Sequence, residues 1–214
     1  YAANEFEAGE HGGTHLDAPY HFYKQGWKVG DIPLEKLIVP GVLMDVSQEV
    51  NDNADFELKA DRIKKWEEDN GDLPEGAVLL IRYGWAKDYN NRRRYFGLDQ
   101  GNRMHFPGLS ADGAEYLAKK RNLAGVGVDT PSVDTGRTTI NPAHIWLQGA
   151  NMYIIENLNL DVGLPENDFT VVVMPMKITE GTGAPCRVVA MLNSSSHLIA
   201  MTALLLLTIG TRIF

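Results

Sequence analysis

The sequence is poor in cysteine, in positive charge and in long apolar runs. Its one cysteine, Cys186, cannot form an internal disulfide, and a zinc site built from cysteines is excluded. Asp and Glu number 28 against 20 Lys and Arg, which gives a formal net charge of −8. Because such a surface repels phosphate, we expect no nucleic-acid partner. The 44% of hydrophobic residues in a chain of 214 predicts a globular domain with a sizeable core.

The two ends of the sequence are unusual. The chain begins at Tyr1, close to its first dense motif, and we interpret it as an N-terminally truncated fragment. We expect one domain over residues 1–192, followed by a hydrophobic tail over 193–214. Leu198–Ile209 is almost wholly apolar but shorter than the ~20 residues that span a bilayer as a helix. A terminal helix, a cut membrane segment and a lipid-anchor signal all stay open. Membrane contact is expected only if the tail is an anchor, and the location, cytoplasmic or secreted, stays open as well.

Strand-like and helix-like segments alternate along the chain. Apolar, β-branched runs predict strands over 36–46, 77–81, 124–128, 152–155, 169–174 and 187–192. The first of these contains Pro40-Gly41 and is expected to hold a bulge or to form two short strands. Helices are predicted over 61–68, 110–121 and 142–148, with Asp61, Ser110 and Asn141 as their N-caps. The alternation predicts a single α/β domain with a mixed sheet.

Three familiar catalytic or cofactor motifs are absent. Gly125-Val126-Gly127 follows a strand, but no third glycine opens a helix as a dinucleotide fingerprint requires. His11-Gly12-Gly13 is similar to the start of a lipase oxyanion loop, yet the chain has no Gly-x-Ser-x-Gly nucleophile elbow. A His-Glu-x-x-His helix is also missing, which disfavours a zincin-type protease.

The segment from His11 to Phe22 carries the chemical signal. His11, His15, Asp17 and His21 all stand at odd positions, and alternate side chains of an extended chain point to one face. The chain must bend for His11 to join the others, which Gly12-Gly13 permits, and Pro19 can turn His21 back toward them. Two imidazoles and a carboxylate suit Zn²⁺ or Mn²⁺ and leave coordination positions open. The segment therefore predicts a metal site.

The same segment resembles the His-x-Gly-Thr-His-x-Asp-x-Pro-x-His signature of the metal-dependent cyclase family, which includes bacterial-type kynurenine formamidase and isatin hydrolase. The resemblance continues through 106–110 and 127–134 to His144 and Glu156, and it covers about residues 10–192. It implies a barrel-like mixed sheet with flanking helices, of the swivelling β/β/α type, and a homodimer or homotetramer.

The resemblance also assigns roles to residues. His11, His15 and Asp17 would hold a first metal, and Asp17 would bridge to a second held also by His144 and Glu156. One or two Zn²⁺ ions, or Mn²⁺, are therefore expected. The position of His21 implies the proton donor and acceptor. His105 and His197 match no ligand position of the family.

An arylformamidase activity follows from the resemblance. The substrate would be a small aromatic amide, N-formyl-L-kynurenine, cut by metal-activated water to L-kynurenine and formate in tryptophan catabolism. Tyr20, Trp85 and Phe106 are candidates for the pocket wall, with Arg82 as a partner for the carboxylate. A cyclic-amide hydrolase of the isatin type, a ring-closing cyclase and a non-catalytic binding homologue remain alternatives.

Overall fold

One short strand near the N-terminus closes a large mixed sheet. The structure is a computed structural model that describes residues 1–51, 53–120, 123–193 and 204–206. Its helices are α1 (Ser47–Val50), α2 (Ala60–Asn70), α3 (Arg92–Tyr95), α4 (Ala111–Lys120) and α5 (Pro142–Gly149). Its strands are β1 (His15–Asp17), β2 (Ile38–Asp45), β3 (Glu57–Leu58), β4 (Val78–Arg82), β5 (Gly108–Leu109), β6 (Gly125–Val128), β7 (Tyr153–Glu156), β8 (Phe169–Pro175), β9 (Gly183–Leu192) and β10 (Leu204–Leu206).

The strand order in the large sheet is β1-β7-β6-β4-β2-β8-β9-β10, and β1 pairs with β9 as well as with β7. The sheet therefore closes through β1 into a barrel-like core of seven strands, and β10 extends β9 outside the closure. Neighbouring strands in the series β2, β4, β6 and β7 are parallel, whereas β8, β9 and β1 pair antiparallel. The predicted α/β domain with a mixed, barrel-like sheet is confirmed.

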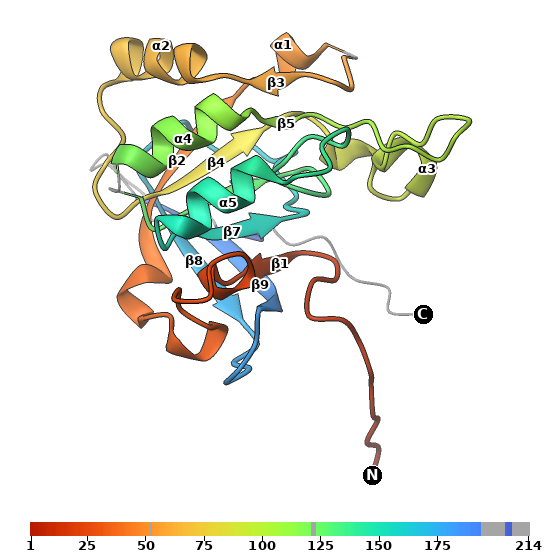
Figure 1. Ribbon diagram of the computed structural model, residues 1–214. Helices are drawn as coiled ribbons and strands as arrows, with labels where there is room; N and C mark the ends of the chain where they lie inside the picture. Colours follow the sequence, from red (N-terminus) through yellow and green to blue (C-terminus); the bar gives the residue numbers. More distant parts are fainter. Residues whose placement is uncertain (52, 121–122, 194–203, 207–214) are drawn as a thin grey trace.

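Two apolar cores explain why the parallel strands are apolar throughout. In β4, Val78 and Leu80 lie in a core inside the barrel, while Leu79 and Ile81 lie in a second core under the helices. Helices α2, α4 and α5 gather on that outer face of the sheet (Figure 1). Because both faces are buried, the strands read as continuous apolar runs rather than as alternating ones.

The glycines of Gly125-Val126-Gly127 make room inside the barrel. A Cβ at Gly125 would lie 2.5 Å from the Tyr153 ring and 2.6 Å from its carbonyl oxygen. A Cβ at Gly127 would lie 2.7 Å from methyl carbons of both Leu80 and Leu158. Val126 meanwhile packs into the outer core. The two glycines that resemble part of a dinucleotide fingerprint thus allow side chains of neighbouring segments to pack closely against β6.

Two predicted helix caps were wrong. Helix α2 begins at Ala60, one residue before Asp61, and the Ala60 N–H donates to the carboxylate of Asp112 at 3.0 Å. Asn141 has φ +46° and makes no side-chain cap for α5. A distant carboxylate takes over in both helices, and for α5 it is that of Asp134. The Ser110 cap is confirmed, because its Oγ accepts from the Gly113 N–H at 3.2 Å.

Three of the predicted strands and helices have different extents. Strand β2 is continuous through Pro40-Gly41, because Gly41 leaves space for the Phe169 ring of β8. Helix α2 runs on to Asn70 and β9 begins already at Gly183. The small parallel pair of β3 and β5 was not predicted.

The hydrophobic tail is described only in part. Residues 204–206 form β10 against β9, so a helix does not cover them, and the other residues of the tail lie outside the described part. Among the described residues, no helix is both long and apolar enough to cross a membrane.

We predict that Gly125→Ala destabilises the fold. Its new methyl group meets the backbone of β7, and overpacking of this kind costs about 1–3 kcal/mol. Denaturant unfolding followed by circular dichroism measures the effect. Gly163→Ala is the control, since a Cβ there meets nothing within 4 Å and the exposed site should tolerate it. Equal unfolding midpoints for the two variants would contradict this packing role.

Candidate metal centre

The pairing of β1 with β7 brings the signature motif to a second acidic residue. In this register His15 stands opposite Glu156, and His15 Nε2 lies 3.5 Å from Glu156 Oε2. Asp17, two residues further along β1, is 1% exposed and its Oδ1 lies 3.0 Å from His15 Nε2. Leu16 points the other way, into the barrel core. The alternation predicted for this segment is present, but only His15–Asp17 is a strand.

The two outer histidines reach the centre from turns. The backbone bends at Gly13, where φ is +63°, and His11 Nδ1 lies 2.5 Å from Asp17 Oδ1. His21 ends a short 3-10 helix that begins at Pro19, and its ring stacks on that of His11 with 4.1 Å between centroids. The bends expected at Gly12-Gly13 and at Pro19 are therefore present.

Three imidazoles each have one ring nitrogen held by the protein and the other turned toward Asp17. The His15 Nδ1 donates to the Gly13 carbonyl at 2.9 Å, which leaves Nε2 without its proton in the neutral ring. Thr182 Oγ1 donates to Glu10 and so accepts from His11 Nε2 at 2.8 Å, which leaves Nδ1 facing Asp17. These outer bonds select the tautomer in which the inner nitrogen can bind a cation.

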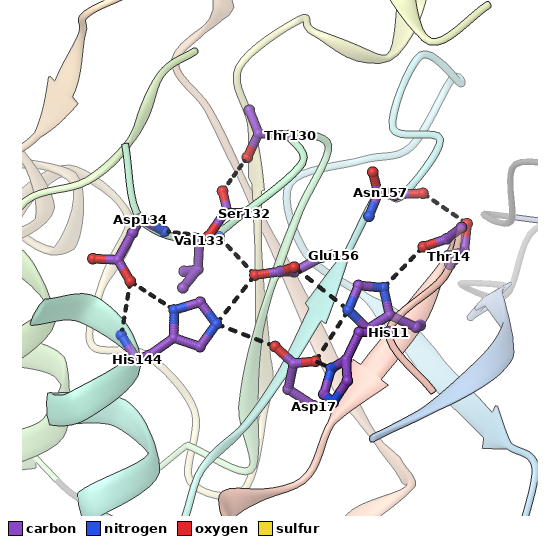
Figure 2. Close-up of polar contacts among 12 residues, drawn as sticks. His11, Thr14, Asp17, Thr130, Ser132, Val133, Asp134, His144, Glu156 and Asn157 are labelled. Carbon is purple, nitrogen blue, oxygen red and sulfur yellow. Dashed lines mark hydrogen bonds and ion pairs between the residues drawn. The ribbon is translucent and has the colours of Figure 1, made fainter. Parts of the chain in front are cut away.

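His144 follows the same scheme from the first turn of α5. Its Nδ1 lies 2.6 Å from Asp134 Oδ2 (Figure 2), and the Asp134 carboxylate also accepts the backbone N–H groups of Ala143 and His144. The opposite nitrogen, Nε2, lies 3.2 Å from Asp17 Oδ2 and 3.3 Å from Glu156 Oε1. Asp134 thus fixes both the start of the helix and the orientation of the ring.

Glu156 is aimed by the backbone. The Val133 N–H donates to Glu156 Oε1 at 3.0 Å, and the residue after it, Asn157, accepts from Thr14 Oγ1 through its carbonyl at 2.6 Å (Figure 2). The five predicted ligands, His11, His15, Asp17, His144 and Glu156, therefore converge on one place. Their roles as ligands remain a prediction.

The acidic and basic groups of the centre shift one another's pKa. Burial would raise the pKa of Asp17, but hydrogen bonds from His11, His144 and His15 hold it well below its usual value. Burial also opposes protonation of His15, yet the hydrogen bond and charge of Asp17 raise its pKa to about 9. His21 differs, because burial lowers its pKa to about 4 and no side chain compensates fully. The ring of His21 is therefore neutral at pH 7.

The residues fit a divalent cation. Ligand atoms of His15, Asp17 and Glu156 lie within 4.8 Å of one another, and so do those of His11, Asp17 and His21. Asp17 belongs to both groups, which combine the residues differently from the two ligand sets that the resemblance implies. Buried carboxylates and imidazoles with anchored outer nitrogens form a donor set typical of Zn²⁺ or Mn²⁺, in which a cation would replace the protons on the inner nitrogens.

A cleft of about 970 Å³ opens over these residues. Beside the centre, its wall consists of Phe22, Tyr89, Asn90, Arg92, Tyr95, Phe96, Pro131, Ser132, Asn141 and Asn157. Tyr20, Trp85, Phe106 and Arg82, which were expected at the pocket wall, do not line this cleft. Phe106 is buried at 3% exposure, and Arg82 forms an ion pair with Asp45 at 2.9 Å.

The aromatic side of the cleft is hydrogen-bonded to the segment that carries Glu156. Tyr95 Oη lies 3.0 Å from Asn157 Oδ1, and the Tyr95 carbonyl accepts from Trp85 Nε1 at 2.7 Å. Asp129 is fully buried and accepts the N–H groups of Tyr83 and Trp85. Trp85 therefore supports the wall from behind rather than facing the cleft.

Sequence reasoning assigned no role to Asp134, Thr182 and Glu10. Their hydrogen bonds orient histidines of the centre. Thr182 lies at the other end of the domain from His11, and Glu10, although it directly precedes His11, orients that ring through Thr182, so local spacing carries no signal for either role. Asp134 stands near Pro142 in the sequence, and a carboxylate shortly before a helix start was the one available sign. His105 pairs with Asp55 at 2.9 Å outside the cleft, and His197 lies outside the described residues.

Comparison with known proteins places this geometry in a family. The model of the Cyclase family matches residues 2–135. The chain is 33% identical over 201 residues to isatin hydrolase of Roseibium aggregatum, with 89% of this chain and 75% of that protein covered. It is 31% identical over 182 residues to kynurenine formamidase of Bacillus mycoides, with 84% and 75% covered.

Solved structures agree. Isatin hydrolase A from Ralstonia solanacearum superposes with a TM-score of 0.82 at 33% identity, covering 89% of this chain and 75% of that one. A protein described as a potential metal-dependent hydrolase with cyclase activity reaches 0.66 at 28% identity, covering 85% and 79%. With a family match over more than half of its length and relatives that are hydrolases, the chain belongs to the Cyclase family of metal-dependent hydrolases.

Proposed function

We propose that this protein is a metal-dependent amidohydrolase that cleaves the carbon-nitrogen bond of small aryl amides, N-formyl-L-kynurenine first among them. One observation carries the proposal. Three imidazoles, those of His11, His15 and His144, have their outer nitrogens anchored and their inner nitrogens around Asp17, beneath an aromatic cleft. The relative from Bacillus mycoides is named for a formamidase activity, which supports the same assignment.

His11, His15, Asp17, His144 and Glu156 are the residues that would hold one or two Zn²⁺ or Mn²⁺ ions. A divalent ion in such a set supplies a Lewis acid, which makes water a better nucleophile near neutral pH and polarises a carbonyl. The anchored imidazoles add rigidity, because none of the three rings has to rotate before it binds.

The His21 ring supplies the proton transfer. It stands beside His11, is accessible from the cleft, and its pKa of about 4 keeps it neutral at pH 7. A neutral imidazole accepts the proton of the attacking water as the new carbon-oxygen bond forms. It then returns that proton to the amide nitrogen while the carbon-nitrogen bond breaks, so formate and a free aryl amine leave.

The aromatic side chains provide the surface for the aryl group. Phe22, Tyr89 and Phe96 line the cleft around the centre. Phe22 also packs on His144, with ring centroids 4.8 Å apart, so an aryl group on Phe22 would be held close to the proposed ligands.

Hydrolysis of isatin is the second candidate. Isatin is a cyclic aryl amide, and its opening needs the same water attack and proton return. The identity of 33% and the TM-score of 0.82 to isatin hydrolases favour this candidate.

We predict that the protein loaded with Zn²⁺ or Mn²⁺ hydrolyses N-formyl-L-kynurenine, isatin or both, and that a chelator removes the activity. Re-addition of the metal should restore it, as expected if the ion acts in the reaction. Absorbance assays for L-kynurenine and for isatin follow the two reactions. Failure of the metal-loaded protein to turn over either compound would overturn the hydrolase assignment.

We predict that His21→Ala lowers kcat by about 10²–10⁴-fold, as for loss of a general acid-base group. Metal content, measured by atomic emission, should remain close to that of the unmodified protein. His105→Ala serves as the control, because His105 lies outside the cleft. If metal content and rate fall together in His21→Ala, His21 is a ligand.

We predict that Asp134→Asn weakens metal binding by about 10–100-fold, the usual effect of losing a carboxylate that orients a ligand histidine. The amide can still accept one backbone N–H of α5, so the helix start is kept in part. Competition with a chromogenic chelator gives the affinity, and Asp161→Asn, an exposed position, is the control. Unchanged affinity with a lowered melting temperature would assign Asp134 to the fold alone.

A further inference from the structure

The guanidinium of Arg92 is an unused positive charge in the cleft. Arg92 begins helix α3, is exposed, and is the only Lys or Arg among the cleft residues that the structure describes. No hydrogen bond or ion pair of its side chain is present within the described residues. Its neighbour Arg94, by contrast, lies 3.6 Å from Asp88.

The charge balance of the cleft leaves Arg92 uncompensated. The carboxylates among the cleft residues are Asp17 and Glu156, and both point into the centre, where imidazoles and the proposed cations face them. A substrate that enters the cleft therefore meets a positive charge that does not belong to the proposed metal centre. In a protein with net charge −8, a local cation of this kind favours an anionic substituent.

Helix α3 is held in a defined place relative to the centre. The Asn91 side chain caps it by accepting the Arg94 N–H at 3.2 Å. The last residue of α3, Tyr95, contacts Asn157, which directly follows the proposed ligand Glu156. The backbone of Arg92 thus belongs to an element that is hydrogen-bonded to the residue after a proposed ligand.

We propose that Arg92 binds a carboxylate of the substrate and thereby selects aryl amides that carry a carboxylate remote from the scissile bond. This inference rests on the proposed function of the cleft. A guanidinium forms two parallel, charge-assisted hydrogen bonds with a carboxylate, and it remains charged at any working pH. Tyr89 and Phe96 line the same cleft and would contact the aryl group.

Arg92→Gln tests the inference in the full, metal-loaded chain. The substrates are N-formyl-L-kynurenine and its methyl ester, which lacks the anionic carboxylate. Arg92→Gln should raise KM for the acid by about tenfold or more, with kcat little changed, and leave the ester unaffected. Arg92→Lys should retain part of the affinity for the acid, since it keeps the charge but loses the two parallel hydrogen bonds of the guanidinium.

Arg93→Gln is the matched control, because Arg93 is an exposed neighbour that does not line the cleft. Equal KM values for the acid in the two glutamine variants would overturn the role of Arg92. An equal loss for acid and ester in Arg92→Gln would do so as well, since it would indicate a structural effect.

Calorimetric titration with L-kynurenine and its methyl ester separates this inference from the proposed function. If no variant hydrolyses either substrate, yet Arg92→Gln alone loses affinity for L-kynurenine, Arg92 binds the carboxylate and the hydrolase assignment fails. If hydrolysis proceeds and binding of L-kynurenine is the same in all variants, the hydrolase assignment stands and the role of Arg92 fails.

Discussion

The burial of the Asp17 carboxylate is the constraint on which the centre depends. A charge that is 1% exposed is costly unless positive or hydrogen-bonding groups surround it, and here three imidazoles do so. Each imidazole needs a partner for its other nitrogen, and those partners come from the Gly13 carbonyl, Thr182 and Asp134. The outer hydrogen bonds therefore help to stabilise the buried Asp17 carboxylate, because an imidazole free to rotate would leave it without a partner.

The fold meets this constraint with very little regular structure. Strand β1 has three residues, yet it pairs on both sides and closes the barrel. Its middle residue, Leu16, packs in the barrel core, and this fixes the opposite direction for His15 and Asp17. Strands β6 and β7 are parallel, and their carboxyl ends lie beside β1. Glu156 at the end of β7 and the loop after β6 therefore lie next to His15 and Asp17. The same pairing of β1 that closes the barrel therefore also positions the proposed ligands.

Most of the strands were predictable because the signal is local. The apolar runs at 77–81 and 124–128 follow from burial on both faces, and the spacing of His11, His15, Asp17 and His21 marks the centre in one segment. The helix caps were not predictable, since the carboxylates that replace Asp61 and Asn141 come from other segments. The aromatic wall escaped as well, because residues 89–96 are positioned by hydrogen bonds such as that of Tyr95 to Asn157, which leave no periodic pattern.

With a single cysteine the chain has no internal disulfide, but the proposed metal centre could link distant segments instead. A cation held jointly by Asp17 and His144 would join the two ends of a loop of more than a hundred residues, as a covalent cross-link does in disulfide-rich proteins. Closing a long loop removes conformational freedom mainly from the unfolded chain, and the benefit grows slowly with loop length. The same ion that serves the chemistry would then fasten the N-terminal strand to the body, and its release would loosen the barrel at the strand that closes it.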